Sequence, residues 1–231
     1  MAVSLAHEAA LWDAGATVVA GIDEVGRGAL AGPVTVGVCA VARCDAWPEG
    51  LADSKELTPA RRLRMADALA GFGAARAVAH ASPAEIDALG IVGALRLAGT
   101  RALAAIAAEG VRVDAVLLDG KHDWLTPPPA TLFGDLDAPD PASASALQEP
   151  AVPTPPVTMV IKGDTLCASI AAGSVLAKVE RDGLMAEAHE RHPEFGWAGN
   201  KGYGAAAHLD AIRLLGPTDE HRRSWSLPER T

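Results

Sequence analysis

Four acidic residues stand where apolar, strand-like runs of the sequence end. Asp23 and Glu24 follow the run VVAGI, Asp119 follows VLL, and Asp164 follows VTMVIK and one glycine. Any one of them alone is equally well explained as a turn former or a helix cap. Four together are better explained by neighbouring strand ends, where crowded carboxylates repel one another unless a cation shares the site. Such oxygen-rich sites suit Mg²⁺ or Mn²⁺, and two such ions can clamp both reacting oxygens in phosphoryl transfer.

The loop that follows the first acidic pair is rich in glycine. Gly26, Arg27 and Gly28 begin the segment GRGALAG, whose glycines permit close approach of a ligand and whose arginine suits phosphate or sugar oxygens. The glycine spacing misses the G-x-G-x-x-G fingerprint of dinucleotide-binding proteins, and the acidic pair would repel a pyrophosphate. A nucleotide-dependent oxidoreductase therefore fits less well. A tight turn with a surface arginine remains the structural alternative.

Further hydrogen-bond donors occur in three short segments. They are Ser54 and Lys55 after Asp53, Ser174 and Lys178 at helical spacing, and Lys201 and Tyr203 of KGYG. A hydroxyl, an ammonium and a helix N-terminus suit a phosphate, residues four apart share a helix face, and a tyrosine in a basic loop can stack on a sugar or base. The structural alternatives are a charged loop, a solvated helix face and an aromatic ring folded over the core edge.

The histidines and the C-terminal arginines give weaker signals. The histidines, among them His189, His192, His208 and His221, show no zinc-binding spacing, so surface or helix-end positions are expected for most of them. His221, Arg222 and Arg223 form the densest basic patch near the end of the chain.

The elements that must position these residues alternate between strand and helix patterns. Strands are predicted at 17–22, 33–42, 74–80, 113–118 and 157–162. Helices are predicted at 58–70, over a short segment from 82, and at 92–109, 168–190 and 204–215. Thr58-Pro59 and the capping box that starts at Ser82 mark two helix starts. The alternation predicts an α/β domain with a mixed sheet covered by helices.

Composition excludes several classes of protein. No stretch approaches about 18 uncharged apolar residues, so no membrane span is expected. The first 15 residues lack the basic and apolar regions of a secretory signal. The three cysteines, Cys39, Cys44 and Cys167, form no CxxC pair, which fits a reducing cytoplasm and argues against disulfides or structural zinc. A cytoplasmic location is therefore expected.

One segment differs in composition from the rest of the chain. Residues 122–156 hold nine of the 16 prolines and five acidic residues, with no lysine or arginine. We interpret them as a flexible insertion loop within a single domain that spans residues 1–231. This segment and the four strand-end acids together account for the whole net charge of −9. The acidic balance therefore does not exclude a nucleic-acid partner.

An ordered set of motifs resembles bacterial ribonuclease HII, the type 2 ribonuclease H. The motifs are GIDEVGRGALAGPV, ADSKEL, LLDGKHDW, VIKGD, SIAAGSVLAKVERD, NKGYG and HRRSW, from about residue 18 to 227. The resemblance implies an RNase H-like mixed β-sheet flanked by helices, with C-terminal helices and the Pro-rich acidic insertion added. It implies a monomeric, metal-dependent endonuclease that cuts the RNA strand of RNA–DNA hybrids. It also implies nicking 5′ of ribonucleotides embedded in duplex DNA, which leaves 3′-hydroxyl and 5′-phosphate ends, as in ribonucleotide excision repair.

The resemblance also assigns roles to residues. It makes Asp23, Glu24, Asp119 and Asp164 the ligands of two Mg²⁺ or Mn²⁺ ions. Gly26, Arg27 and Gly28 would sense the ribose 2′-hydroxyl, which alone distinguishes RNA from DNA on that sugar. Tyr203 would stack on the following deoxyribose, and Ser54, Lys55, Ser174, Lys178 and Lys201 would meet the nucleic-acid backbone. Asp182 is interpreted as structural.

Two departures from the family pattern stand out. Ala52 replaces a frequent asparagine, and the segment between LLDG and VIKGD is longer than usual. A non-catalytic nucleic-acid binder on the same fold is the alternative function. Such a protein is expected to lose one or more of the strand-end acids, and this chain keeps all four.

Overall fold

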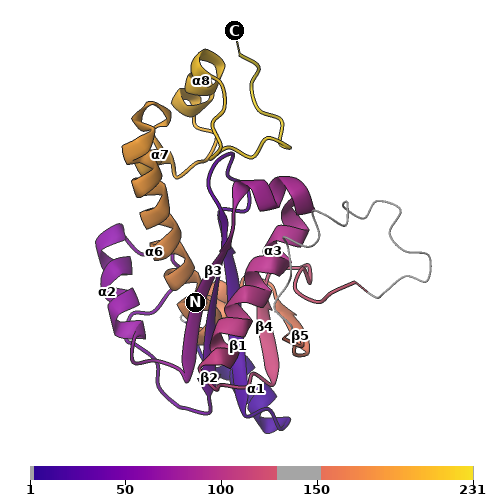
Figure 1. Ribbon diagram of the computed structural model, residues 1–231. Helices are drawn as coiled ribbons and strands as arrows, with labels where there is room; N and C mark the ends of the chain where they lie inside the picture. The colour runs from indigo at the N-terminus through magenta and orange to yellow at the C-terminus, as the bar shows by residue number, and fades with distance from the viewer. Residues whose placement is uncertain (1–2, 129–151, 231) are drawn as a thin grey trace, which may run out of the picture.

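A five-stranded mixed sheet forms the centre of the molecule (Figure 1). The structure is a computed structural model that describes residues 3–128 and 152–230. The strands are β1 (Val18–Val25), β2 (Val34–Ala42), β3 (Ala75–Ala81), β4 (Ala115–Asp119) and β5 (Val157–Val160), in the order β3-β2-β1-β4-β5. The pairs β1–β2 and β2–β3 are antiparallel, whereas β1–β4 and β4–β5 are parallel. The predicted mixed sheet is confirmed.

Helices cover both faces of this sheet. They are α1 (Ala6–Asp13), α2 (Pro59–Leu69), α3 (Pro83–Ala108), α5 (Gly163–Leu166), α6 (Ala168–Arg191), the 3₁₀ helix η2 (Pro193–Phe195), α7 (Trp197–Asn200) and α8 (Ala206–Leu215). The two predicted helices at 82 and 92–109 follow one another as α3, which kinks at Gly90, where φ is 67°. Both predicted helix starts are present: Thr58 accepts a hydrogen bond from the Arg61 amide, and Ser82 and Glu85 form a capping box.

Alternating residues of the strands belong to two separate apolar clusters, one on each face of the sheet. Ile22 and Val36 face one side, where Leu95 and other α3 residues cover them. Val19 and Val41 face the other side, beneath α1, α2 and α6. Because both faces are covered, the strands read as nearly continuous apolar runs. A third cluster, around Phe195 and Trp197, lies where α6 extends past the sheet toward α7 and α8 (Figure 1).

Helix α6 packs on the sheet with backbone against backbone. A Cβ atom on Gly21 would lie 2.2 Å from the Ile170 amide nitrogen, and one on Gly37 would lie 2.0 Å from the Gly173 carbonyl oxygen. Only glycine therefore allows this approach. The contact brings the first turns of α6 close to the segment of β1 that carries Asp23 and Glu24.

Helix α3 is long and apolar. It has 26 residues and contains an 18-residue window with a mean hydropathy of 1.5, so one helix is long and apolar enough to cross a membrane. Arg96 and Arg101 lie inside this window, so α3 holds no run of about 18 uncharged apolar residues and the expectation from sequence is not contradicted. Half of the window is buried inside the protein, and Leu95, Leu97 and Ile106 belong to the cluster that covers the sheet.

The predicted insertion lies largely beyond what the structure describes. Residues 129–151 are outside the described ranges. In the described start of this segment, Trp124 and Leu125 are buried, and Leu125 Cδ1 would lie 2.7 Å from a Cβ on Gly99 of α3. The chain is therefore anchored to the core just before the proline-rich part begins.

Candidate active site

Three of the four predicted acids meet at one end of the parallel strands. Oxygen atoms of Asp23, Asp119 and Asp164 all lie within 4.8 Å of one another. The parallel register explains the first two: Ile22 pairs with Leu118, so the next residues, Asp23 and Asp119, continue side by side. Asp164 joins them from α5, which follows β5 directly.

The local geometry differs from simple strand ends. Strand β1 continues to Val25 because β2 pairs with it beyond the parallel register, so Asp23 and Glu24 lie inside β1 rather than after it. Strand β5 ends at Val160, and the chain then turns through Lys162, with φ of 58°, into the helix that carries Asp164.

A hydrogen bond connects this turn to the group of three carboxylates. The Gly163 amide donates a 2.7 Å hydrogen bond to Asp119 Oδ1. A Cβ on Gly163 would lie 2.4 Å from Ile170 Cδ1, so glycine fits this turn tightly against α6.

The electrostatics of the cluster call for a cation. Burial, opposed by a hydrogen bond from Ser174 and reinforced by repulsion from Asp119 and Glu24, raises the pKa of Asp23 to about 8. Burial and repulsion from Asp164 also raise the pKa of Asp119. Three close carboxylates with only oxygen donors fit a hard divalent cation such as Mg²⁺ or Mn²⁺. The donor set lacks the histidine or cysteine ligands typical of zinc.

Glu24 stands apart from the three-carboxylate group. Its Oε1 atom accepts a 3.2 Å ion-pair hydrogen bond from Arg27 Nη1, and its side chain is half-buried. Glu24 is nevertheless close enough to raise the pKa of both Asp23 and Asp119 by repulsion. The structure therefore places it beside the cluster, held by the arginine of the glycine-rich loop.

The predicted Ser54-Lys55 segment reaches the acid cluster. Lys55 Nζ lies 3.1 Å from Asp164 Oδ2 and 3.9 Å from Asp53 Oδ1, while its own side chain is 73% exposed. The hydroxyls of Ser174 and Ser54 lie 3.0 Å apart in a hydrogen bond, and both serines are buried. In this structure Lys55 can reach both the carboxylates and a ligand from solvent, whereas the serines support each other and Asp23.

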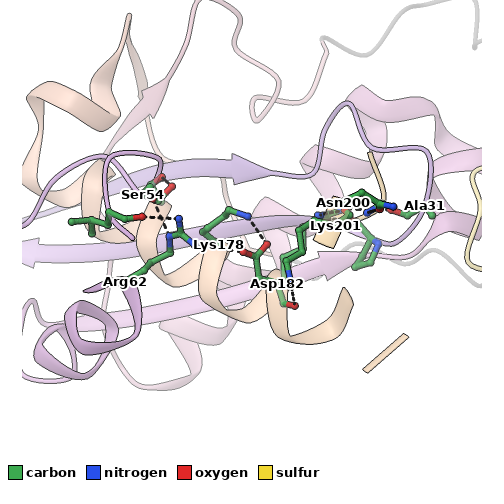
Figure 2. A network of polar contacts seen from close by, with 12 residues as sticks. Ala31, Ser54, Arg62, Lys178, Asp182, Asn200 and Lys201 are labelled. Atoms are coloured by element: carbon green, nitrogen blue, oxygen red, sulfur yellow. Dashed lines mark hydrogen bonds and ion pairs between the residues drawn. The ribbon is translucent and has the colours of Figure 1, made fainter. Parts of the chain in front are cut away.

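A polar network runs from this segment along α6 (Figure 2). Arg62 donates a 2.9 Å hydrogen bond to the Ser54 carbonyl and lies 3.5 Å from Asp182. Asp182 also pairs with Lys178, and its carbonyl accepts a 3.5 Å hydrogen bond from Lys201 Nζ. Asp182 thus sits at the centre of a structural network that joins the Ser54-Lys55 segment to the KGYG loop.

The glycine-rich loop that begins at Gly26 and the KGYG loop at residues 201–204, both predicted to contact the substrate, lie against each other. The amides of Leu30 and Ala31 both donate to the Gly202 carbonyl, at 2.8 and 3.2 Å. Tyr203 is 42% exposed, and the Arg181 guanidinium carbon lies 5.8 Å from the centre of its ring. The structure therefore brings Gly26, Arg27 and Gly28 into the same region as Tyr203.

Two arginines in this region received no role from the sequence. Arg181 and Arg222 are fully buried, so Arg222 adds nothing to an exposed basic surface. Their guanidinium groups bind backbone carbonyls, which satisfies their donors without exposure to water. For Arg181 a signal existed: it continues the helical spacing of the buried residues Ala177, Met185 and Ala188.

His208, in the first turn of α8, and His221 are both buried. His208 Nδ1 lies 2.8 Å from the Tyr203 carbonyl and must donate, so its Nε2 accepts from Trp197 Nε1 and from His221 Nε2. His221 Nδ1 then accepts from the Thr218 amide at 3.0 Å. This pattern is complete only when both rings are neutral, and burial lowers both pKa values, that of His221 to about 4.

Comparisons with known proteins identify a family and a fold. A family profile described as Ribonuclease HII matches residues 20–227. Ribonuclease HII of Streptomyces avermitilis is 47% identical over 212 residues, which cover 92% of this chain and 78% of that protein. Among solved structures, ribonuclease H2 of Pyrococcus horikoshii OT3 has a TM-score of 0.57 at 24% identity, covering 90% of this chain and 94% of that one. Bst-RNase HIII in complex with Mn²⁺ has a TM-score of 0.60 at 20% identity, covering 92% and 68%. These two structures support the fold.

Proposed function

Because the chain belongs to the ribonuclease HII family and is an endonuclease that hydrolyses RNA in RNA–DNA hybrids, we propose that it also nicks duplex DNA 5′ of embedded ribonucleotides. The products are 3′-hydroxyl and 5′-phosphate ends. The observation that carries the proposal is the group of three carboxylates, Asp23, Asp119 and Asp164, within 4.8 Å of one another. The neighbouring loops supply donors suited to a sugar and a phosphate.

Different residues of the chain would hold the metal ions and bind the phosphate. Asp23, with Asp119 and Asp164, would hold one Mg²⁺ or Mn²⁺, and Asp23 with Glu24 would hold the second. When bound, such ions activate a water for in-line attack and stabilise the leaving oxygen. The exposed ammonium of Lys55 lies beside Asp164 and is well placed to bind the phosphate that approaches the acids.

The glycine-rich loop and the KGYG loop, which lie against each other, determine which substrate is cut. The backbone of Gly26, Arg27 and Gly28 binds the 2′-hydroxyl of the ribose, and Tyr203 stacks on the following deoxyribose. Lys178 lies between these loops and Ser54, and Lys201 lies at the start of the KGYG loop, along the path that the phosphates would follow. The protein acts as a cytoplasmic monomer in ribonucleotide excision repair.

A gel assay tests the proposal. Duplexes with a single ribonucleotide, with an all-RNA strand, and with DNA only are incubated with Mg²⁺, with Mn²⁺ or with a chelator. Wild-type protein should nick the first, degrade the second and leave the third intact, only with a metal. Ligation of the nicked product checks for 3′-hydroxyl and 5′-phosphate ends.

Two variants separate catalysis from binding. Asp23→Asn should lower the rate about 100-fold or more, because it removes a central metal ligand. Asp210→Asn makes the same chemical change at an exposed position of α8 and should leave the rate unchanged. Binding of the ribonucleotide duplex without any metal-dependent cleavage would instead support the non-catalytic alternative.

A further inference from the structure

Two buried guanidinium groups lie beneath the glycine-rich loop. Arg181 comes from α6 and Arg222 from the segment after α8, and both are fully buried. Within residues 3–128 and 152–230 neither forms an ion pair with a carboxylate. Their donors go instead to backbone carbonyls of residues 26–33 and 201. Burial of an arginine charge without a carboxylate is costly, so these contacts need a reason beyond filling space.

Arg222 fixes the direction of the peptide groups in the loop. It donates to the carbonyls of Gly26 at 2.6 Å and Arg27 at 2.9 Å, and to Gly32 at 3.1 Å. In a trans peptide the carbonyl and the following amide point in opposite directions. The amides of Arg27 and Gly28 therefore point away from the buried guanidinium, and neither has a hydrogen-bond partner in the described part of the chain. A Cβ on Gly28 would meet nothing within 4 Å, so this side of the loop is open.

Arg181 ties the same loop to Tyr203. It donates to the carbonyls of Pro33 at 2.9 Å and Lys201 at 3.0 Å, and its guanidinium carbon lies 5.8 Å from the Tyr203 ring centre. Gly26 has a φ of 85°, and a Cβ there would lie 2.0 Å from Arg181 Nε. Gly26 must therefore be glycine beside Arg181, and Arg181 sets the distance from the loop to the tyrosine.

We propose that Arg222 and Arg181 are positioning residues for substrate selection, Arg222 for recognition of the ribose and Arg181 for recognition of the sugar that follows it. This inference rests on the proposed function and deepens it. By holding the Gly26 and Arg27 carbonyls inward, Arg222 leaves the Arg27 and Gly28 amides as paired donors for the 2′-hydroxyl oxygen. By holding Lys201 and Tyr203, Arg181 keeps the ring where a 2′-hydroxyl on the next sugar would collide with it.

Variants at the two positions should change selectivity in different ways. Arg222→Lys keeps the charge but cannot reach three carbonyls at once. Its preference for binding a duplex with one ribonucleotide over all-DNA duplex, measured with a chelator present, should fall about tenfold, as expected for one hydrogen bond. Arg181→Lys should keep that preference and lose about tenfold in the cleavage preference for one ribonucleotide over two consecutive ribonucleotides.

Controls separate positioning from folding and from metal binding. Arg223→Gln changes the neighbouring arginine, which pairs with the exposed Asp219, and should leave both preferences unchanged. Circular dichroism should report folded Arg222→Lys protein, and calorimetric titration should give the wild-type Mn²⁺ affinity. In wild-type protein, the ribonucleotide duplex should slow hydrogen exchange of the Arg27 and Gly28 amides more than all-DNA duplex does. This last measurement needs no variant.

Three results would overturn the inference. One is a folded Arg222→Lys protein with the wild-type preference for ribonucleotide duplex. Another is equal exchange of the Arg27 and Gly28 amides with both duplexes while the wild-type protein prefers the ribonucleotide duplex. The third is the absence of any preference in the wild-type protein, which would contradict the proposed function itself and remove the inference with it.

Discussion

Asp23 carries a proton in the metal-free protein at neutral pH, because burial and neighbouring carboxylates raise its pKa to about 8. A divalent cation must therefore displace this proton when it binds. We expect the Mg²⁺ affinity to rise by up to about tenfold per pH unit between pH 6 and 8, and to change less above pH 8. Isothermal titration in two buffers of different ionisation enthalpy would measure both the affinity and the proton released. Release of no proton at pH 7 would contradict the raised pKa.

The same residue should lower the stability of the metal-free protein at high pH. The folded state keeps the Asp23 proton up to about pH 8, whereas the unfolded chain releases it near the ordinary pKa of 3.8. The contribution to stability is therefore complete below pH 4 and is lost as pH rises from 4 to 8, by at most about 1.4 kcal/mol per unit. Asp23→Asn should remove this slope in thermal unfolding with a chelator present, and Asp210→Asn should retain it. Equal slopes in wild-type and Asp23→Asn proteins would count against the assignment.

Lys55 offers a test of phosphate contact at a single residue. Its exposed ion pair with Asp164 contributes little to stability, so Lys55→Gln should fold normally. Its affinity for nucleic acid should fall, and the slope of log affinity against log salt should shrink by about one charge. Arg112→Gln removes an exposed charge near the start of β4 and serves as the control. An unchanged salt slope in Lys55→Gln would rule out a phosphate contact.

At the scale of elements, the backbone contact between α6 and the sheet determines where the site can form. Gly37→Ala would place a methyl group 2.0 Å from the Gly173 carbonyl oxygen, which cannot move independently of α6. We expect a loss of stability of about 1–3 kcal/mol and reduced cleavage, because α6 carries Ser174 and Lys178. Gly183→Ala, also on α6, meets nothing within 4 Å and should stabilise the helix by about 0.5–1 kcal/mol. Urea unfolding would measure both. A neutral Gly37→Ala would show that α6 can shift without consequence.

The elements that local signals mark were predictable, and those that distant contacts create were not. Thr58 and Ser82 have cap patterns that identify their helices, and the apolar strands alternate with these helices clearly. Helix α1 was missed because its N-cap residue, Leu5, makes no side-chain capping bond. Its role depends on a partner far along the chain: the buried Glu8 accepts a 2.9 Å hydrogen bond from the Ser169 amide and thereby caps α6.

The site was predictable to a similar extent and for a similar reason. Parallel register brings Asp23 and Asp119 together, so residue type and position after an apolar run were enough to find them. Glu24 was grouped with them, yet its contact with Arg27 depends on how the following loop folds back. Arg222 could not be placed from sequence, because nothing near it along the chain indicates that its partners are the carbonyls of residues 26, 27 and 32.

The molecule as a whole is negatively charged, whereas the region beneath the glycine-rich loop is positively charged. The chain carries a net charge of −9. Arg181 and Arg222 nevertheless place two positive charges, without carboxylate partners among the described residues, beneath the glycine-rich loop and the KGYG loop. Burial and repulsion from Arg181 lower the pKa of Arg222 to about 9, still above neutral pH. An acidic protein can therefore attract a polyanion locally, and this attraction should weaken as salt rises.

The histidine pair gives the C-terminal part of the molecule its own acid sensitivity. Folded His221 has a pKa of about 4, so the unfolded chain binds its proton first as pH falls below the ordinary value of 6.5. Stability is therefore complete above pH 6.5 and declines between pH 6.5 and 4, by up to about 1.4 kcal/mol per unit, opposite in sign to the effect of Asp23. Thermal unfolding of Asp23→Asn protein should reveal this decline. His221→Asn should reduce it, and exposed His7→Gln should not; a decline that survives His221→Asn would assign it elsewhere.

The bond from Arg222 to Gly26 joins residues 196 positions apart, and it sets an order of events during synthesis. The strands and all four acids leave the ribosome well before residue 222 does. A nascent chain can therefore assemble its carboxylates, and bind metal, while the glycine-rich loop still lacks the arginine that orients it. The metal-binding site would therefore form before the loop that selects ribose over deoxyribose. A chain that ends before residue 222 would bind metal but would not distinguish ribose from deoxyribose.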